Sequence, residues 1–169
     1  HDLDRFRLRP IFERLTRAGV TNCEVISAQD KGKLEAAGPF DCVVIDAPCS
    51  GSGSWRRKPD AKWRLTEKQF LQRQKDQAQV LEKGYALARA GGTILYITCS
   101  VLPEENTEQV QAFLARHPDV KIVPYQEQWA KTIGGVAPLS ADGAADTLVL
   151  SPASHDTDGF FAAIMRKPI

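Results

Sequence analysis

The stretch FDCVVIDAPCSGSGS, residues 40–54, decides the fold. Its residues 41–46 are mostly apolar and partly β-branched, which predicts a fully buried β-strand. The strand ends on Asp46, and Pro48 and Cys49 follow before a run of glycine and serine alone. Because Pro48 stiffens the turn, the Asp46 carboxylate and the Cys49 thiol should keep fixed relative positions, which suits a site that needs defined geometry.

A helix and a second buried strand follow along the chain. Apolar residues recur at helical spacing over residues 66–90, and Thr66 with Gln69 makes a capping box at the start. Gly91-Gly92 is expected to end this helix. The run TILYITCS, residues 93–100, then predicts a buried strand that ends in Cys99.

The alternation of helix and strand defines the predicted fold class. A helix is predicted from Leu3 to Ala18 with Asp4 as its N-cap, although Pro10 could move its start to a later residue. The other predicted elements are a strand over residues 23–28, a helix from Pro103-Glu104-Glu105 to His117-Pro118, and a strand over residues 159–166. This order predicts a single α/β domain over residues 1–169 with a mainly parallel sheet. In such sheets the binding and catalytic residues usually lie at the carboxyl ends of the strands, and Cys49 and Cys99 are both at such ends.

Composition limits the class of protein. The chain has 169 residues, 43% of them apolar, and a net charge of +1, so it can bury one core and is neither strongly basic nor acidic. Its four cysteines form no CxxC pair, and the sequence shows neither a signal peptide nor an apolar run of membrane-spanning length. We therefore expect a cytoplasmic monomer away from membranes. The three histidines lie far apart, which argues against a metal site.

The four cysteines divide into two classes. Cys23 and Cys42 fall inside predicted strands, where a free cysteine usually packs as a small hydrophobic residue. Cys49 and Cys99 each follow the last residues of a buried strand, so their thiols should emerge at the edge of the sheet. Asp46 could instead be a simple turn former or helix cap.

The loop of residues 50–54, SGSGS, matches no glycine motif with a known mechanism. It lacks the third glycine of a dinucleotide-binding fingerprint and the Gly-Lys-Ser/Thr of a phosphate loop. It does not match a nucleophile elbow either. We expect a mobile loop, a hinge that could admit a bulky substrate beside the two thiols.

A basic segment, SWRRKPDAKWR at residues 54–64, follows this loop. It has five basic residues against one acidic residue, a local charge of +4, with two tryptophans interleaved. Charges alone would suggest an ordinary solvated surface, but interleaved aromatic residues favour phosphate contacts together with stacking on a single-stranded base. The candidate RNA-contacting residues are Trp55, Arg56, Arg57, Lys58, Lys62 and Trp63.

Four motifs together are similar to a known family. They are DAPCSGSG at 46–53, RRKPDAKW at 56–63, GGTILYITCSVLPEEN at 91–106 and DGFF at 158–161. In this order they resemble the Sun/Nop family of RNA cytosine-5 methyltransferases, most closely its bacterial ribosomal RNA branch. The resemblance extends from Asp2 to Phe161.

The resemblance implies a fold, a cofactor and roles for the two thiols. The fold is Rossmann-like, the cofactor is S-adenosylmethionine, and the substrate is RNA, 16S ribosomal RNA above all. By the match, Cys99 attacks the pyrimidine ring and Cys49 assists release of the product. Asp46 would face both the methionine end of the cofactor and the target base.

The chemistry requires such a set of groups. Carbon 5 of cytosine is a poor nucleophile, so a thiolate must add at carbon 6 before carbon 5 can take the methyl group. A proton donated to ring nitrogen 3 stabilises the adduct, which is the task assigned to Asp46. The base must be flipped out or single-stranded to enter the site.

Two further acids match cofactor-binding positions of the family. Asp2 matches the residue that holds the ribose hydroxyls, although by itself it could be a mere terminal charge. Asp30 falls where the family places an acid near the adenine amino group, with Gln29 in place of the usual glycine. The DGFF motif could shape the RNA-side pocket, or Asp158-Gly159 could form a turn while Phe160 and Phe161 pack in the core.

The family's first strand and glycine-rich cofactor loop would precede Asp2, and they are absent from this chain. We therefore expect the C-terminal part of a catalytic domain, which alone would bind the cofactor weakly. Three alternatives remain: a non-catalytic RNA-binding module, a related enzyme acting on transfer RNA, and a cysteine hydrolase. The last would need a histidine beside the thiol, for which the sequence shows no motif.

Overall fold

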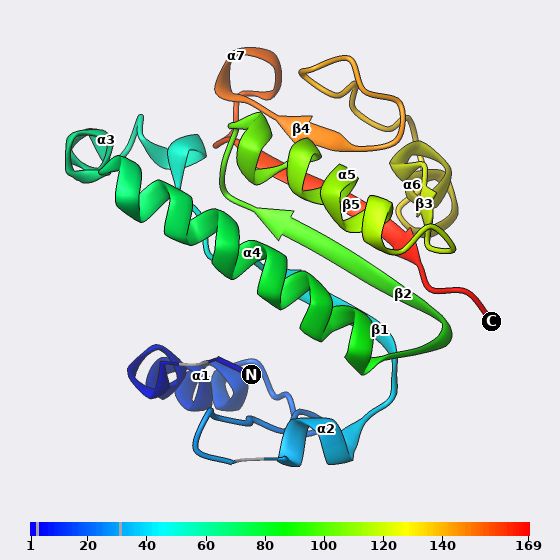
Figure 1. Cartoon of the computed structure of the whole chain (residues 1–169). Coiled ribbons are helices and arrows are strands. Elements are labelled where there is room, and N and C mark those ends of the chain that lie inside the picture. The colour runs from blue at the N-terminus through cyan, green and yellow to red at the C-terminus, as the bar shows by residue number, and fades with distance from the viewer. Residues whose placement is uncertain (3, 31) are drawn as a thin grey trace. The chain divides into compact units, whose positions relative to one another are not determined.

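The computed structural model describes residues 1–2, 4–30 and 32–169, which form two compact units (Figure 1). Unit 1 covers His1–Pro39 and unit 2 covers Phe40–Ile169. Each unit is described by itself below. The single-domain organisation stays a prediction.

Unit 1 contains two helices. Helix α1 spans Arg5–Arg17, and the Asp4 side chain accepts a hydrogen bond from a backbone N–H of its first turn, so the predicted N-cap is confirmed. The helix runs through Pro10, which therefore does not delay its start. Leu3, the predicted first residue, lies outside the described residues. The short helix α2 spans Lys33–Ala37.

The strand predicted over residues 23–28 is wrong. Among the described residues of unit 1, this segment makes a single parallel bridge, between Ser27 and Asp2. Only Ile26 of the six residues is buried, and Cys23 is exposed. A β-branched run becomes a strand only where it finds a ladder of partners, so the packing role predicted for Cys23 is wrong as well.

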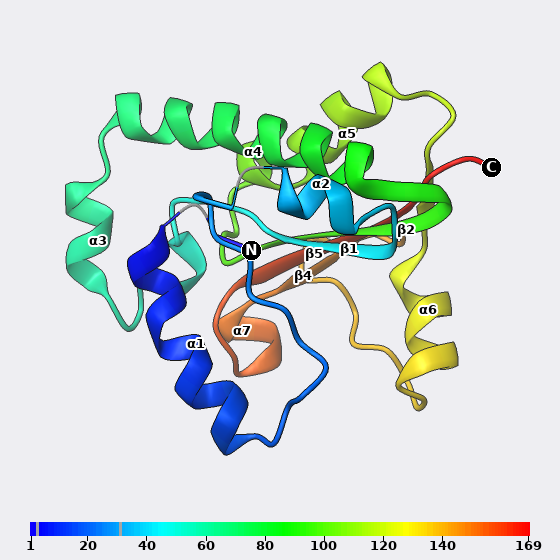
Figure 2. The same ribbon diagram turned by 90° about the horizontal axis from the view of Figure 1, so that it is seen from below.

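Unit 2 holds one sheet and five helices among its described residues. The strands are β1 (Phe40–Asp46), β2 (Ala88–Thr98), β3 (Lys121–Val123), β4 (Leu148–Leu150) and β5 (Phe160–Arg166). The helices are α3 (Pro59–Arg64), α4 (Glu67–Leu87), α5 (Thr107–Arg116), α6 (Tyr125–Thr132) and α7 (Pro152–His155). Figure 2 shows α4 and α5 on one side of the sheet and α6 and α7 on the other.

The sheet is only partly parallel, so the prediction of a mainly parallel sheet is only partly confirmed. Strands β1 and β2 pair in parallel, whereas β5 runs antiparallel to β2, β3 and β4. The chain enters β5 at the carboxyl end of β2, where Phe161 lies opposite Thr98, and then runs back along it. Alternating burial of residues 160–166 reveals the strand but not its direction.

One face of the sheet forms the core with α4 and α5. Alternate residues of β2 and β5 point to this face, as the two-residue period of a strand requires. Each fully buried large apolar side chain contributes roughly 1.5–3 kcal/mol. The completely buried ones are Leu81, Ile94, Tyr96, Phe113, Phe161 and Met165.

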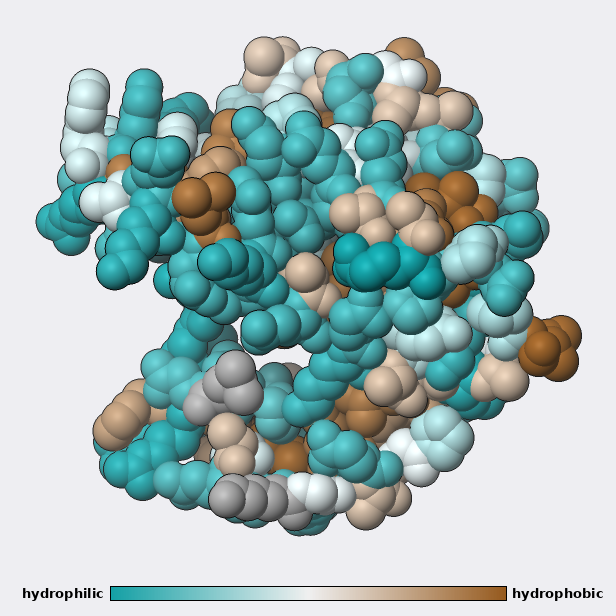
Figure 3. All heavy atoms as spheres, viewed as in Figure 1, coloured by the Kyte–Doolittle hydropathy of each residue, from teal (hydrophilic) through white to brown (hydrophobic). Residues whose placement is uncertain are grey.

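Helix α4 begins as predicted but ends earlier. Thr66 and Gln69 form the capping box, whereas the helix ends at Leu87. Gly91-Gly92 lies inside β2 instead, and a Cβ at Gly92 would come within 3.2 Å of the Phe40 carbonyl oxygen of β1. The glycine therefore permits close approach of two strands. Hydrophilic side chains cover most of the outward surface of α4 (Figure 3).

Strand β1 is not fully buried, contrary to the prediction. Only Ile45 is buried, while Cys42 and Val44 are exposed. The side chains of Val43 and Ile45 lie against Gly84 of α4, and the alternate residues point to the other face. The packing role predicted for Cys42 is therefore wrong, because its strand lies at the edge of the sheet and only one of its faces is packed.

The region after β2 contains elements that the sequence pattern shows poorly. Residues Pro103–Glu105 form a 3-10 turn, and α5 follows from Thr107 with Val110 and Phe113 buried, close to the prediction. Strands β3 and β4 are three residues each, too short to display a period. Within the described part of the chain, no helix is long and apolar enough to cross a membrane.

Candidate active site

The structure brings Cys49 and Cys99 together just beyond the carboxyl ends of β1 and β2. Their sulfur atoms are 3.3 Å apart, and both side chains are partly buried. The two strands pair in parallel up to Asp46 and Ile97, and Ala47 N–H still donates to the Ile97 carbonyl at 2.9 Å. Parallel pairing therefore delivers both thiols to one point.

The hydrogen bond between the sulfurs makes the two thiols unequal. It lowers the pKa of Cys99 to about 7, against the opposing effects of burial and of the Asp46 charge. The same hydrogen bond, followed by burial, raises the pKa of Cys49 well above its usual range. At neutral pH, Cys99 is thus the partly ionised sulfur and Cys49 donates its S–H to it.

Asp46 occupies the last position of β1, opposite Ile97 of β2. It is exposed, and its carboxylate is close enough to Cys99 for its charge to oppose ionisation of that thiol. An accessible carboxylate beside an ionisable thiol can orient a polar ring that the thiol attacks.

The prediction of a mobile glycine and serine loop is wrong. Ser52 and Gly53 are buried. The Ser52 hydroxyl bonds the Ser100 hydroxyl at 2.8 Å and accepts from Val101 N–H, while Gly53 N–H donates to the Cys99 carbonyl at 3.0 Å. Small side chains here permit close packing on the TCS segment, and the loop holds Cys99 in place instead of moving beside it.

The DGFF motif supports the same loop from β5. A Cβ at Gly53 would lie 2.0 Å from the Gly159 carbonyl oxygen, so the two backbones cross in contact. Gly159 N–H donates to the Gly53 carbonyl at 2.9 Å. The predicted core packing is right for Phe161, which is fully buried, and wrong for Phe160, which is 39% exposed.

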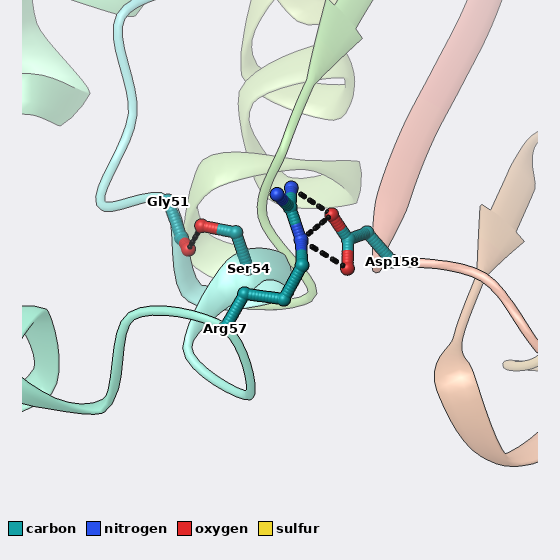
Figure 4. A network of polar contacts seen from close by, with 4 residues as sticks. All are labelled: Gly51, Ser54, Arg57 and Asp158. Atoms are coloured by element: carbon teal, nitrogen blue, oxygen red, sulfur yellow. Dashed lines mark hydrogen bonds and ion pairs between the residues drawn. The ribbon is translucent and has the colours of Figure 1, made fainter.

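Asp158 of the same motif ties the basic segment to β5 (Figure 4). Arg57 donates to one Asp158 oxygen through two atoms, Nε at 2.8 Å and Nη2. Within the preceding loop, Ser54 Oγ donates to the Gly51 carbonyl at 2.8 Å. The ion pair lowers the pKa of Asp158. Part of the charge of Arg57 is therefore compensated within the protein.

The remaining candidate RNA contacts differ in accessibility. Trp63 on α3 is 82% exposed, and the Lys62 ammonium lies 5.5 Å from the centroid of its ring. Arg56 and Lys58 are exposed. Trp55 is half-buried, and its indole N–H is buried with no hydrogen-bond partner in the part of the chain that the structure describes. Trp63 is thus the better platform for a stacked base.

The two predicted cofactor acids of unit 1 meet at Ser27. Asp2 forms the backbone bridge with Ser27, and one Asp30 oxygen accepts from the Ser27 N–H and hydroxyl, both at 2.8 Å. These bonds lower the pKa of Asp30. The Asp2 carboxylate accepts from the Asp4 N–H at 2.8 Å. Carboxylate oxygens such as these are suited to hydroxyl and amino groups of a nucleoside. Among residues 1–2, 4–30 and 32–169, no cluster of His, Cys, Asp and Glu could hold a metal ion.

Sequence reasoning missed two residues at this site, Gln77 and Glu105. Both are completely buried and hydrogen-bond to the segment that carries Cys49. The sequence pattern places Glu105 only in the first turn of a helix. Helical spacing could have indicated that Gln77 is buried, because Gln77 stands four residues before the buried Leu81 and therefore on the inward face of α4.

The distance between the thiols has a direct test. Treating the protein with diamide, which takes up two electrons and two protons, is expected to join Cys49 and Cys99 in one intramolecular disulfide. Peptide mass spectrometry after blocking free thiols should find this bridge, with Cys23 and Cys42 alkylated as an internal control. A bridge that involves Cys23 or Cys42 instead would contradict the observed geometry.

Comparisons with known proteins agree on one family. Residues 1–166 match the family described as 16S rRNA methyltransferase RsmB/F. The chain is 34% identical over 170 residues to ribosomal RNA small subunit methyltransferase B of Citrobacter koseri, covering 98% of this chain and 36% of that protein. It thus spans about a third of the length of this relative.

Solved structures of other proteins share the fold. PH0851 superposes with a TM-score of 0.82 and 30% identity, covering 98% of this chain and 36% of that one. NSun6 from Pyrococcus horikoshii with SFG gives a TM-score of 0.74 and 25% identity, covering 98% and 40%. These matches confirm the predicted methyltransferase fold and the resemblance on which it rested. This chain belongs to the family of 16S rRNA methyltransferases RsmB/F.

Proposed function

We propose that the protein transfers a methyl group from S-adenosylmethionine to carbon 5 of a cytosine in RNA, with 16S ribosomal RNA as the substrate. The observation that carries the proposal is the hydrogen-bonded thiol pair in which Cys99 has a pKa of about 7. Family membership supports the ribosomal RNA substrate. Such a substrate also implies a cytoplasmic protein, and we propose that it acts as a monomer.

Cys99 is the nucleophile in this proposal. Its thiolate adds to carbon 6 of the cytosine, and the electrons of the ring double bond move toward carbon 5. Asp46 lies at the neighbouring strand end; its carboxylate takes up a proton from solvent and passes it to nitrogen 3. The ring is then activated at carbon 5, and the methyl group supplied by the bound cofactor is transferred there.

Cys49 completes the reaction because its pKa depends on the state of Cys99. Once the Cys99 sulfur is bonded to carbon 6, it carries no negative charge, so the main cause of the raised pKa of Cys49 is removed. Cys49 releases its proton to solvent and takes the proton from carbon 5. The electrons of that bond restore the ring double bond, nitrogen 3 returns its proton to Asp46, and Cys99 leaves as a thiolate.

The acids at Ser27 fit the cofactor. Asp2 and Asp30 present carboxylate oxygens that could accept from the ribose hydroxyls and the adenine amino group of S-adenosylmethionine. A solved relative, 25% identical, contains SFG, an analogue of that cofactor. Asp46 would serve at the methionine end, next to the base.

The basic segment is the proposed RNA contact, and Trp63 provides a test. Trp63→Ala should weaken binding of a cytosine-containing single strand of 16S ribosomal RNA by about tenfold, because a stacked base is worth roughly 1–3 kcal/mol. Trp63→Phe keeps an aromatic ring and should bind almost as well as the native protein. Fluorescence anisotropy of labelled RNA would measure both.

A charge variant separates stacking from phosphate contacts. Lys62→Ala should weaken binding and reduce its salt dependence, whereas Lys131→Ala, an exposed lysine on α6, should not. Binding by Trp63→Ala and Lys62→Ala that equals the native protein would remove the segment from the RNA interface.

The modified nucleotide can be found directly. Bisulfite mapping of ribosomal and transfer RNA from a deletion strain should show one cytosine of 16S ribosomal RNA that has lost its methyl group, restored by the native gene. Loss of methylation in a transfer RNA alone would reassign the substrate. Unchanged maps for both RNAs would count against methyl transfer and leave the RNA-binding module as the better function.

A further inference from the structure

Gln77 and Glu105 are polar side chains inside the hydrophobic core, and the proposed chemistry gives them no task. Both have no solvent exposure. Glu105 ends the 3-10 turn that follows the TCS segment, and Gln77 lies on the inward face of α4. Burying a carboxylate and an amide is costly unless both are hydrogen-bonded, so their partners are informative.

The partners of both side chains lie on either side of Cys49. Glu105 accepts from the Ser50 N–H at 2.7 Å through Oε1 and from the Ser50 hydroxyl at 2.5 Å through Oε2. Gln77 Nε2 donates to the Pro48 carbonyl at 2.9 Å and to Glu105 Oε1 at 3.2 Å. The residue before Cys49 and the residue after it are therefore each held from the core, and the two holding side chains bond each other.

Strand β2 also contacts Glu105. Tyr96 of β2 stands three residues before Cys99, and its hydroxyl donates to the Glu105 backbone carbonyl at 2.8 Å. Glu105 is thus fixed to the strand that carries one thiol and bonds the segment that carries the other. We therefore expect a displacement of Glu105 or Gln77 to change the relative position of Cys49 and Cys99.

We infer that Gln77 and Glu105 are positioning residues, a buried clamp that holds the Cys49 thiol against Cys99. The inference rests on the proposed function, which gives the thiol pair its purpose. The clamp keeps the hydrogen bond that ionises Cys99 before attack, and it keeps Cys49 in reach of carbon 5 at release. An apolar pair could fill the same volume but could not hold two backbone groups in register.

Loosening the clamp has a measurable effect on Cys99. The titratable groups that face the two thiols are Asp46, Glu105 and Tyr96, and the sulfur–sulfur hydrogen bond is the largest cause of the lowered pKa of Cys99. If Cys49 moves away, the pKa of Cys99 rises toward the usual value of about 8.5. The thiolate fraction at pH 7 should then fall by roughly tenfold.

The first test measures thiol chemistry without any RNA. The rate of Cys99 alkylation by iodoacetamide is followed against pH in the complete protein by peptide mass spectrometry. Gln77→Met keeps the volume but removes both donated hydrogen bonds, so its profile should shift to higher pH. Glu105→Gln loosens the clamp but also removes a negative charge that raises the pKa of Cys99, so its profile should shift less. The matched controls Gln79→Met and Glu104→Gln, exposed neighbours on the same elements, should follow the native profile.

The second test measures catalysis in the same variants. Gln77→Met should slow product release more than RNA binding, so that covalent protein–RNA adduct persists longer while KM for RNA stays near native. The alkylation profile does not depend on methyl transfer, so a shifted profile in a protein without methyltransferase activity would overturn the proposed function and leave the clamp standing.

Two outcomes decide against the clamp. A folded Gln77→Met protein, checked by circular dichroism, with a native Cys99 profile and native adduct lifetime would overturn it. If Gln77→Met and Glu105→Gln fail to fold, Gln77→Asn keeps the amide but shortens the side chain, so that it no longer reaches the Pro48 carbonyl and Glu105. A native Cys99 profile in Gln77→Asn would then overturn the clamp, and a shift to higher pH would support it.

Discussion

Replacing Cys99 by alanine is expected to abolish methyl transfer and to form no covalent adduct with RNA. The attacking sulfur is lost, and the proposal places the remaining Cys49 thiol in reach of carbon 5 and not of carbon 6. Removing a nucleophile typically costs at least about a thousandfold in rate. Transfer of a labelled methyl group to 16S ribosomal RNA would measure activity, and a denaturing gel would measure adduct.

Two further variants control this prediction. Cys99→Ser keeps nearly the same volume but does not ionise near neutral pH, and it should also be inactive. Cys42→Ala changes an exposed thiol of β1 and should retain full activity. An adduct that forms with Cys99→Ala would show that Cys49 is the nucleophile and would reverse the two roles.

Replacing Cys49 by alanine is expected to trap the covalent adduct. Cys99 can still attack carbon 6, but no thiol remains to take the proton from carbon 5, so the ring cannot expel Cys99. A protein–RNA band that resists denaturation should accumulate with time, whereas the native enzyme turns it over. A variant that releases methylated RNA at the native rate would exclude a role for Cys49 in release.

The same variant predicts a pH dependence with a definite sign. The hydrogen bond from Cys49 lowers the pKa of Cys99 to about 7, so its loss raises that pKa toward the usual value of about 8.5. Adduct formation by Cys49→Ala should therefore be slow at pH 7 and approach the native rate as the pH rises above about 8.5. Equal adduct formation at both pH values would show that Cys99 does not depend on Cys49 for ionisation.

Local sequence rules predicted the starts of α1 and α4 correctly. Asp4 caps α1 and the Thr66–Gln69 capping box begins α4, because each cap uses a side chain that bonds the backbone of the next turn. The ends of β1 and β2 were also placed correctly enough to bring Cys49 and Cys99 to one edge. Such features depend on residues a few positions apart, so a single sequence contains them.

Long-range contacts account for the wrong predictions. Residues 23–28 look like a strand but find only one bridge, and the SGSGS loop looks mobile but is held by the TCS segment and by Gly159. In both cases the deciding partner lies elsewhere in the chain. The direction of β5 is equally invisible in its own residues, because alternation is the same in parallel and antiparallel strands.

The sequence by itself determined which residue types stand at the strand ends: a carboxylate and a thiol after β1, and a second thiol after β2. Only the tertiary structure decided that the sulfurs lie 3.3 Å apart and that Gln77 and Glu105 hold the segment around Cys49. The physical reason is that the hydrogen bonds that ionise one thiol and position the other join groups about thirty to fifty-five residues apart, and only the folded sheet brings such groups within bonding distance.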